Sequence, residues 1–303
     1  MHFQRVSREQ HLKKILVTDG NIGRHVAEGL AKKGAHVRLL VRSFTPNAGW
    51  ESLGIEQVEG DMSNIDSLAK SFEGVDRFFS VTPYVENLVE LGINAVAAAK
   101  RAGVNYVVRS SMIQASETSI TLRRWHREVE KAVEESAIPY TILQPNTFMQ
   151  SLLMNVETVK SANALFMPQG DGKVSMVEVR DIAAVAVVCL TEIGHDGKKY
   201  SITGREALSN YEIAERLGKV LGRKIIYYDV DPEQAKDSML KMGMPVWMVD
   251  TLLELFAVCK AGDCAEVFPF VEQILKRNPV SFDQFLGENA TVFGPAGEVT
   301  GAA

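Results

Sequence analysis

A glycine turn near the start of the chain has the residue types that bind a phosphate. Residues 19–23 read Asp-Gly-Asn-Ile-Gly, directly after an apolar run at 14–18 and before a segment with helical spacing. Glycines there let backbone N–H groups approach a pyrophosphate at a helix N-terminus, where the helix dipole favours an anion. A plain turn before a closely packed helix is the alternative. The expected cofactor contacts in this turn are Thr18, Gly20, Asn21, Ile22 and Gly23.

One arginine bears on the choice of dinucleotide. Arg42 ends the second apolar run, 35–41, and no acidic residue follows it before Glu51. In dinucleotide-binding folds an acidic residue near this point accepts a hydrogen bond from the ribose 2′-OH, whereas an arginine accommodates a 2′-phosphate. The sequence therefore favours NADP(H) over NAD(H), with a solvated arginine at a strand end as the alternative.

Polar residues also follow the later apolar runs. Because ligands of open α/β sheets bind outside the carboxyl ends of the strands, these residues are expected to border the same crevice. Asp61 follows the third run and could reach an adenine amino group, although hydroxyls at strand ends could equally cap helices or turns. The further cofactor contacts expected here are Asp61, Met62, Thr82, Ser110 and Ser111.

The elements that position these residues alternate between strands and helices. Short apolar runs rich in β-branched residues predict strands, and apolar residues at helical spacing predict helices. The predicted strands are 14–18, 35–41, 54–61, 75–81, 104–109 and 139–143, and the predicted helices begin near Ile22 or cover 65–72, 87–102 and 123–136. This alternation implies right-handed crossovers, so we expect an α/β fold with a Rossmann-type, doubly wound parallel sheet.

The second half of the chain is less regular and more helical. A capping box from Ser209 to Glu212 opens one helix, and Asp231-Pro232 opens another. The other elements predicted here are a turn at 170–172, a helix at 180–190, a strand at 200–203 and mostly helix up to Phe293. We expect an NAD(P)-binding domain at 1–150 with 173–205 returning to it, a smaller substrate-binding lobe at 151–172 and 206–293, and a flexible tail at 294–303.

The composition excludes several classes of protein. The 303 residues carry a formal net charge of −5, with 46% hydrophobic and 23% charged residues. This is the composition of a globular protein, and it lacks the basic stripe that nucleic-acid binding requires. The sequence also shows no secretory or membrane-spanning run, so we expect a cytoplasmic protein without a membrane partner. It leaves open whether the chain is a monomer or a homodimer.

The cysteines indicate neither a disulfide scaffold nor a metal site. Cys189, Cys259 and Cys264 form an odd, sparse set of the kind that a reducing cytosol permits. Cys259 and Cys264 do not have zinc-ligand spacing, and no histidine cluster accompanies them. We therefore predict no metal.

The chain resembles the NmrA-like family within the atypical short-chain dehydrogenases/reductases. The segments that carry the resemblance are 15–18 with 20–23, 41–42, 125–130, 139–149, 179–183, 200–204 and 281–285, in family order across nearly the whole chain. The resemblance implies a Rossmann fold that binds NADP. It also implies a family that contains quinone reductases and triphenylmethane reductases as well as regulators that bind NADP without known turnover.

Two departures from the family pattern bear on function. The phosphate loop is two residues shorter than the family's and lacks its first glycine, while Asp19 brings a negative charge to the helix N-terminus. Cofactor affinity is therefore expected to be reduced, or the loop to be remodelled. The Tyr-x-x-x-Lys pair of ordinary short-chain dehydrogenases is also missing, with Leu122 at the tyrosine position if His126 takes the lysine position.

The resemblance and these departures define the expected nicotinamide end of the site. His126 could hydrogen-bond the nicotinamide ribose or donate a proton, or it could be a structural histidine. By resemblance, Asn146 could hold the nicotinamide carboxamide or a substrate oxygen, and Phe148 could form the base of an apolar substrate pocket. The expected catalytic residues are His126 and Asn146, and the expected cofactor contacts at this end are His126, Pro145, Asn146 and Phe148.

Three functions fit these residues. The first is an NADPH-dependent reductase that transfers hydride to a quinone or similar planar, aromatic electrophile, which needs little acid catalysis from the protein. The second is a non-catalytic NADP(H)-sensing regulator. The third is a degenerate family member that binds dinucleotide poorly because of Asp19.

Overall fold

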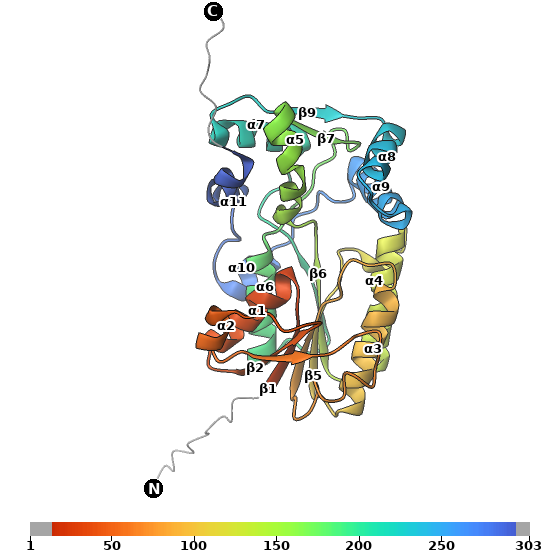
Figure 1. The fold of residues 1–303 in the computed structure, drawn as a ribbon, viewed down its shortest axis with the longest axis vertical. Coiled ribbons are helices and arrows are strands. Elements are labelled where there is room, and N and C mark those ends of the chain that lie inside the picture. The colour runs from red at the N-terminus through yellow and green to blue at the C-terminus, as the bar shows by residue number, and fades with distance from the viewer. Residues whose placement is uncertain (1–13, 295–303) are drawn as a thin grey trace, which may run out of the picture.

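The computed structural model describes residues 14–294, which form a large α/β body and a smaller lobe above it (Figure 1). The strands are β1 (Lys14–Thr18), β2 (His36–Val41), β3 (Glu56–Glu59), β4 (Arg77–Ser80), β5 (Tyr106–Ser110), β6 (Tyr140–Pro145), β7 (Ala164–Met167), β8 (Lys198–Ile202) and β9 (Ile226–Asp229). The first α-helices are α1 (Asn21–Lys32), α2 (Ala48–Ser52), α3 (Leu88–Arg101), α4 (Thr121–Glu135), α5 (Val156–Ala162) and α6 (Val179–Thr191). The later ones are α7 (Asn210–Leu221), α8 (Pro232–Lys241), α9 (Val246–Lys260), α10 (Phe270–Leu275) and α11 (Phe282–Asn289). Short 3₁₀ helices are η1 (Ala115–Glu117), η2 (Met149–Asn155) and η3 (Ala290–Phe293).

Seven of the strands form one parallel sheet. Their order is β3-β2-β1-β4-β5-β6-β8, and each neighbouring pair is parallel. β1 therefore lies inside the sheet, with β2 and β3 on one side of it and β4, β5, β6 and β8 on the other. This confirms the predicted doubly wound Rossmann-type fold, and it places the carboxyl ends of all seven strands at one edge of the sheet.

Each face of the sheet is buried under helices, as the apolar strands require. Alternate residues of β1 point to opposite faces: Ile15 and Val17 join a core with α1 and α6, while Leu16 joins a core with α3. Figure 1 shows α1 and α6 on one side of the sheet and α3 and α4 on the other. Burial on both faces explains why these strands read as continuous apolar runs instead of alternating ones.

The lobe has its own core and a two-stranded parallel sheet. β7 pairs with β9, which the sequence analysis did not anticipate, and α5, α7 and α11 pack around them. Ile213, Leu217 and Phe285 are among the side chains buried in this core. β8, from the 173–205 segment, lies at the edge of the main sheet beside β6. The division of the chain into two domains stays a prediction, and residues 295–303 of the expected flexible tail lie outside the described residues.

The predicted helix at 65–72 is wrong, because this segment is a series of turns. Its apolar residues are nevertheless buried, with Leu68 and Phe72 in the core beside α3. Side chains compete with the helix for backbone N–H groups: Asp61 accepts from Ser63 N at 2.8 Å, and Asn64 accepts from Asp66 N at 3.1 Å. Such local bonds stabilise turns where helical spacing alone predicts a helix.

Helix starts in the second half follow the capping signals. Ser209 and Glu212 form both bonds of a capping box at the start of α7. Asp231 accepts from the backbone N–H groups of Glu233 and Gln234, and Pro232 is the first residue of α8. These caps satisfy N–H groups that a helix leaves without partners, and both predicted helix starts are confirmed.

Candidate functional site

The candidate site lies at the carboxyl ends of β1, β2, β4, β5 and β6. Thr18 ends β1 and is buried, and its hydroxyl accepts from Val81 N at 2.7 Å and donates to Val81 O at 2.9 Å. Thr18 therefore joins the end of β1 to the loop after β4. The Thr18 hydroxyl fixes the relative positions of two strand ends, and the predicted contact of Thr18 with the cofactor stays a prediction.

The turn between β1 and α1 has the geometry of an anion site. Gly20 has a φ of +136°, a conformation that favours glycine, and no side chain caps the N-terminus of α1. A Cβ on Gly23 would lie 1.9 Å from Thr18 O, so only glycine lets the helix pack this closely against the end of β1. The first turn of α1 holds no acidic residue. Its free N–H groups and the helix dipole together suit a pyrophosphate, so these residues fit a dinucleotide.

Asp19, the residue that departs from the family loop, is neutralised by an ion pair. Arg24 Nε lies 2.8 Å from Asp19 Oδ1, and Arg24 Nη2 lies 3.2 Å from Oδ2. The Arg24 guanidinium also lies over the ring of Trp50, 5.7 Å from its centroid. Although partial burial raises it, the pKa of Asp19 is lowered overall by its hydrogen bonds from Arg24 and Gly20 and by the charges of Arg24 and Arg42. The carboxylate is thus ionised and paired.

Arg42 stands at the end of β2 with an exposed side chain. Its charge reaches both Asp19 and Asp61, and in each case it helps to lower the pKa of the carboxyl group. The Asp61 carboxylate accepts from Ser63 N, and Met62 is half-buried, its carbonyl accepting from Asn94 at 3.0 Å. The charge of Arg42 therefore acts on carboxylates at the ends of both β1 and β3.

A fully buried arginine supports the middle of the site. Arg109 of β5 is 0% exposed and donates from Nη2 to Thr82 Oγ1 at 2.9 Å. Its Nη1 reaches the Ser80 hydroxyl at 3.4 Å. Burial lowers the pKa of Arg109 to about 10, against a raising effect from the charge of Glu130, so the guanidinium remains charged at neutral pH. Arg109 places positive charge between the ends of β4 and β5 and orients Thr82.

His126 lies on α4 near this buried charge. Burial and the charge of Arg109 lower the pKa of His126 to about 3, so its imidazole is neutral at neutral pH. Its Nδ1 is buried and has no hydrogen-bond partner within residues 14–294. A neutral imidazole can hydrogen-bond a ligand but holds no extra proton to give. The geometry therefore favours the hydrogen-bonding role of His126 over the proton-donor role.

A buried carboxylate holds three strands to α4. Glu130 is 0% exposed, and its Oε1 accepts from Ser111 Oγ at 2.6 Å and from Gln144 Nε2 at 2.8 Å. Its Oε2 accepts from Arg127 at 3.2 Å and from Lys199 at 3.3 Å. Because its neighbours lie directly after β5, near the end of β6 and near the start of β8, Glu130 ties these three strands to α4. Ser111 is one of the expected cofactor contacts, and it is engaged in this network.

The end of β6 is held by Asn146. Its Nδ2 donates to Ser175 Oγ and to Cys264 O, each at 2.9 Å, and its Oδ1 accepts from Thr147 N at 2.8 Å. The Pro145 carbonyl accepts from Ile113 N at 3.0 Å. With both Nδ2 protons in internal bonds, Asn146 acts here as a positioning residue. Phe148 is half-buried against the core that includes α1 and α6.

Aromatic rings join the lobe to the loop after β4. Tyr84 of that loop makes an edge contact with Trp247 of α9, with ring centroids 5.2 Å apart, and Trp125 of α4 lies 6.1 Å from Trp247. Glu254 of α9 accepts from Thr121 N at 2.6 Å and so caps the start of α4. These contacts hold α9 above α4, as Figure 1 shows.

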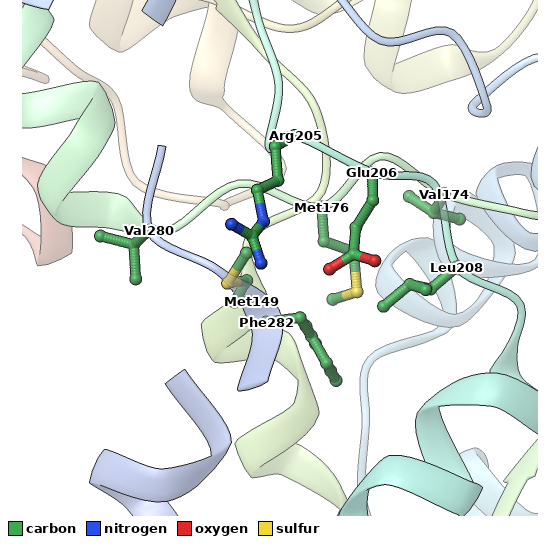
Figure 2. Close-up of a pocket in the computed structure, with 8 residues that line it drawn as sticks. All are labelled: Met149, Val174, Met176, Arg205, Glu206, Leu208, Val280 and Phe282. Atoms are coloured by element: carbon green, nitrogen blue, oxygen red, sulfur yellow. The ribbon is translucent and has the colours of Figure 1, made fainter. Parts of the chain in front are cut away.

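Two hollows elsewhere do not coincide with these residues. A recess beside the end of β8 is lined by Met149, Met176, Arg205, Glu206 and Phe282 among others (Figure 2), and it has no room for a water molecule. An open hollow of about 390 Å³ lies along α7 and β9 and is lined partly by Tyr211 and Tyr227. Neither is lined by residues at the ends of β1, β2, β4 or β5, so neither is assigned to the dinucleotide.

Comparison with known proteins decides the family. Residues 11–286 match the NmrA-like family. The chain belongs to this family. It is 36% identical over 278 residues to a protein named NAD(P)H azoreductase from Xenophilus azovorans, covering 91% of this chain and 97% of that one. Quinone oxidoreductase 2 of Escherichia coli is 25% identical over 238 residues, covering 78% and 83% of the two chains.

Solved structures share the fold. The triphenylmethane reductase of Citrobacter sp. in complex with NADP(H) has a TM-score of 0.81 at 24% identity, covering 91% of this chain and 99% of that one. The negative transcriptional regulator NmrA in complex with NADP has a TM-score of 0.74 at 18% identity, covering 91% and 95%. These likenesses confirm the Rossmann-type fold.

The sequence did not reveal the buried residues that hold the strand ends of the site in place. Arg109 and Glu130 are fully buried. In the sequence, Arg109 looks like an ordinary residue at a strand end, and Glu130 looks like one of many charged residues on a polar helix. A charged residue directly after the apolar pair Val107-Val108 was the available signal for Arg109. No local pattern identified Glu130, because its partners come from three distant strands.

Proposed function

We propose that the chain is an NADPH-dependent reductase that transfers hydride to a quinone or a similar planar electrophile. The observation that carries the proposal is the β1–α1 turn, where free helix N–H groups, Gly20 and a charge-paired Asp19 lie near exposed Arg42. The azoreductase and quinone oxidoreductase relatives support this reading, because both are named for the reduction of conjugated electrophiles.

The chain's own residues would hold the cofactor along the strand ends. The first turn of α1 binds the pyrophosphate through its N–H groups, and Arg42 binds the 2′-phosphate, which makes NADPH preferred over NADH. Asp61 and Met62 border the adenine, and Ser110 and Thr82 lie toward the nicotinamide. Thr18, Arg109 and Glu130 do not need to touch the cofactor, because they position the residues that do.

The chemistry needs little acid catalysis from the protein. When bound, NADPH supplies a hydride from its nicotinamide ring. His126, held neutral by burial and Arg109, donates a hydrogen bond at the nicotinamide end, and solvent provides the proton for the reduced oxygen. With Leu122 in the position of the missing tyrosine, a quinone is a better substrate than a simple alcohol or ketone.

The substrate would be planar and aromatic because aromatic rings gather where the lobe meets α4 and the loop after β4. Trp247 of α9 contacts both Tyr84 and Trp125, and such rings favour offset stacked or edge contacts with aromatic groups. The aromatic nature of the substrate is therefore part of the proposal.

We further propose that the chain acts in the cytoplasm as a monomer or homodimer, without a membrane, nucleic-acid or metal partner. Within residues 14–294 no helix has the length and apolar character needed to cross a bilayer.

The regulator reading has weaker support. The NmrA regulator is 18% identical to this chain, and at that level the likeness extends to the fold alone. The named reductases reach 36% identity over nearly their whole length. A sensor would also bind NADPH, so binding by itself does not separate the two functions.

Steady-state oxidation of NADPH with a panel of quinones and azo dyes tests the proposal. The expected result is quinone-dependent oxidation above the rate without enzyme, which saturates with both substrates. Saturable NADPH binding without turnover of any acceptor would support the sensor instead. Absence of both binding and turnover would support the degenerate reading.

A further inference from the structure

Two of the three cysteines meet at the end of α9. The Sγ atoms of Cys259 and Cys264 lie 2.6 Å apart, closer than two thiols approach without interacting. Cys189 is buried elsewhere, in the core beside α1 and α6. The sequence predicted no zinc site at Cys259 and Cys264, because their spacing does not suit zinc. The fold brings them together for another reason.

The turn after α9 is a Schellman motif that folds the chain back on the helix. Gly262 has a φ of +98°, and its N–H donates to Cys259 O at 3.0 Å. The next N–H, of Asp263, donates to Val258 O at 3.1 Å. This pair of bonds ends a helix and reverses the chain, so the residue after Asp263 faces the last turn of α9. The sequence Lys-Ala-Gly-Asp between the cysteines therefore builds the contact between them.

Fixed contacts hold both sides of the turn. The Cys264 carbonyl accepts from Asn146 Nδ2 at 2.9 Å and from Ser175 N at 3.0 Å, which fastens Cys264 to the end of β6. A Cβ on Gly172 would lie 2.2 Å from Cys259 O, so the 170–172 turn packs directly on the other cysteine. The two sulfur atoms are thus held together by backbone packing on both sides.

The surroundings make the two thiols chemically different. Arg123 is 0% exposed, and its guanidinium lies 3.9 Å from the carboxylate of Asp263. The hydrogen bond from Cys259 and the charge of Arg123 lower the pKa of Cys264, although burial opposes them. The same hydrogen bond and burial raise the pKa of Cys259. Cys264 is therefore the more acidic of the two thiols, which suits it to be the nucleophilic cysteine and Cys259 to be the resolving one.

We propose that Cys259 and Cys264 are an oxidation site, at which a hydroperoxide converts the two thiols into a reversible intramolecular disulfide. The Cys264 thiolate attacks one peroxide oxygen, the O–O bond breaks, and Cys264 becomes a sulfenic acid while the other oxygen leaves as an alcohol or water. The Cys259 thiol then attacks the Cys264 sulfur, forming the S–S bond and releasing water. The two sulfurs lose two electrons, the peroxide gains them, and a dithiol reverses the reaction.

Small oxidants can reach the pair although both side chains are only 2% exposed. Ala261, Gly262 and Asp263 are exposed, so the turn that joins the cysteines lies at the surface. The proposed oxidation therefore requires only that a small oxidant enter through this surface turn. The site is independent of the proposed reductase function, since neither sulfur is assigned a role in hydride transfer.

The chain offers a direct test, because Lys260 lies between the two cysteines. Trypsin cleaves after Lys260, so Cys259 falls in peptide 242–260 and Cys264 in peptide 261–276. The full chain is treated with hydrogen peroxide, free thiols are blocked with N-ethylmaleimide, and the digest is analysed by mass spectrometry. We expect the two peptides to be joined by a disulfide, with the loss of two hydrogen atoms, and dithiothreitol to separate them.

Variants and an internal control make the test decisive. Cys189 is buried and burial raises its pKa to about 12, so its peptide should carry N-ethylmaleimide after denaturation whether or not peroxide was added. Cys259→Ser should abolish the linked peptides and leave Cys264 as a sulfenic acid that dimedone traps. Cys264→Ser should abolish both the link and the trapping. The proposal is overturned if peroxide leaves both cysteines free in the wild type, or if Cys189 oxidises as readily as Cys264.

Discussion

Arg24 and Asp19 form a two-point ion pair across the first turn of α1, with Nε–Oδ1 and Nη2–Oδ2 distances of 2.8 and 3.2 Å. The pair explains how a loop with a carboxylate at a helix N-terminus can still accept a phosphate. Arg24 supplies the compensating charge, and Trp50 holds the guanidinium in place. The ion pair is compatible with a remodelled loop, and NADPH titration decides between that alternative and reduced cofactor affinity.

Removing the partner of Asp19 should weaken NADPH binding. Arg24→Gln leaves an unpaired carboxylate beside the bound pyrophosphate, and we expect the Kd for NADPH to rise about tenfold. Stability should change by less than about 1 kcal/mol, because the Arg24 side chain is 55% exposed. Fluorescence titration of NADPH measures the effect.

Adding Asp19→Asn should restore most of the affinity, and Arg101→Gln, which removes another exposed ion-paired arginine, is the control. Equal affinity in Arg24→Gln and wild type would contradict this role.

Arg42 should set the preference between the two dinucleotides. Arg42→Ala removes a charge-assisted hydrogen bond to the 2′-phosphate, worth about 1.5–3 kcal/mol, so kcat/KM for NADPH should fall about 10- to 100-fold. The value for NADH should stay within about twofold, because NADH carries a hydroxyl at that position. Parallel decreases for the two cofactors would show that Arg42 does not read the 2′-phosphate.

The half-buried His126, whose Nδ1 is buried, should make stability depend on pH. Its pKa is about 3 in the folded chain and about 6.5 in the unfolded chain, so the unfolded state binds more protons between these values. Above pH 6.5 the imidazole is neutral in both the folded and the unfolded chain, so the full stability is present. As the pH falls from 6.5 toward 3, protonation favours the unfolded chain, and stability is lost. Between pH 7 and pH 5 the free energy of unfolding of the wild type should fall by about 2 kcal/mol more than that of His126→Gln.

Urea denaturation at the two pH values measures this difference. His36→Gln, which changes an exposed histidine on β2, is the matched control and should follow the wild type. The pH dependence of kcat/KM offers a second readout, in which no ionisation of His126 should be seen between pH 5 and pH 8. A wild type and a His126→Gln variant with the same pH dependence of stability would contradict a neutral buried imidazole.

Glu130 should be the most costly single side chain of the site to remove. Glu130→Ala removes the hydrogen-bond acceptor of Ser111 and Gln144. It also removes one of the two carboxylates that pair with Arg127 and Lys199. We therefore expect the free energy of unfolding to fall by about 3–5 kcal/mol. Glu134→Ala is the control on the same helix, since Glu134 pairs with the same two cations and is 25% exposed. Equal losses in the two variants would show that burial of Glu130 adds nothing.

Much of the fold followed from local sequence patterns, because strands buried on both faces and helices with caps have strong signatures. The phosphate turn was predicted for the same reason: Gly20 and Gly23 stand between a strand and a helix that are themselves easy to predict. The error at 65–72 came from side chains that bond their own backbone, since Leu68 and Phe72 have helical spacing whether the chain is helical or turned. β7 and β9 were missed because they lie in the lobe, outside the alternation of strands and helices by which the equally short β3 and β4 were placed.

The support of the site depends on contacts between distant segments, which no local pattern shows. Thr18 was expected to contact the cofactor and lies against Val81, 63 residues away. Asn146 was expected to touch the nicotinamide, and it holds Cys264, 118 residues away. In both cases the position at a strand end was predicted and the hydrogen-bond partner was not. The cofactor roles of the predicted site residues stay predictions until binding is measured.

Titration of the wild-type chain with NADPH, followed by the fluorescence of the bound cofactor, tests the central claim most directly. We predict saturable binding at one site per chain, reversed by excess NADP⁺ and lost when a quinone is added, because the bound NADPH is then oxidised. A chain that gives no saturable signal, although circular dichroism shows it folded, would contradict the claim that the β1–α1 turn holds a dinucleotide.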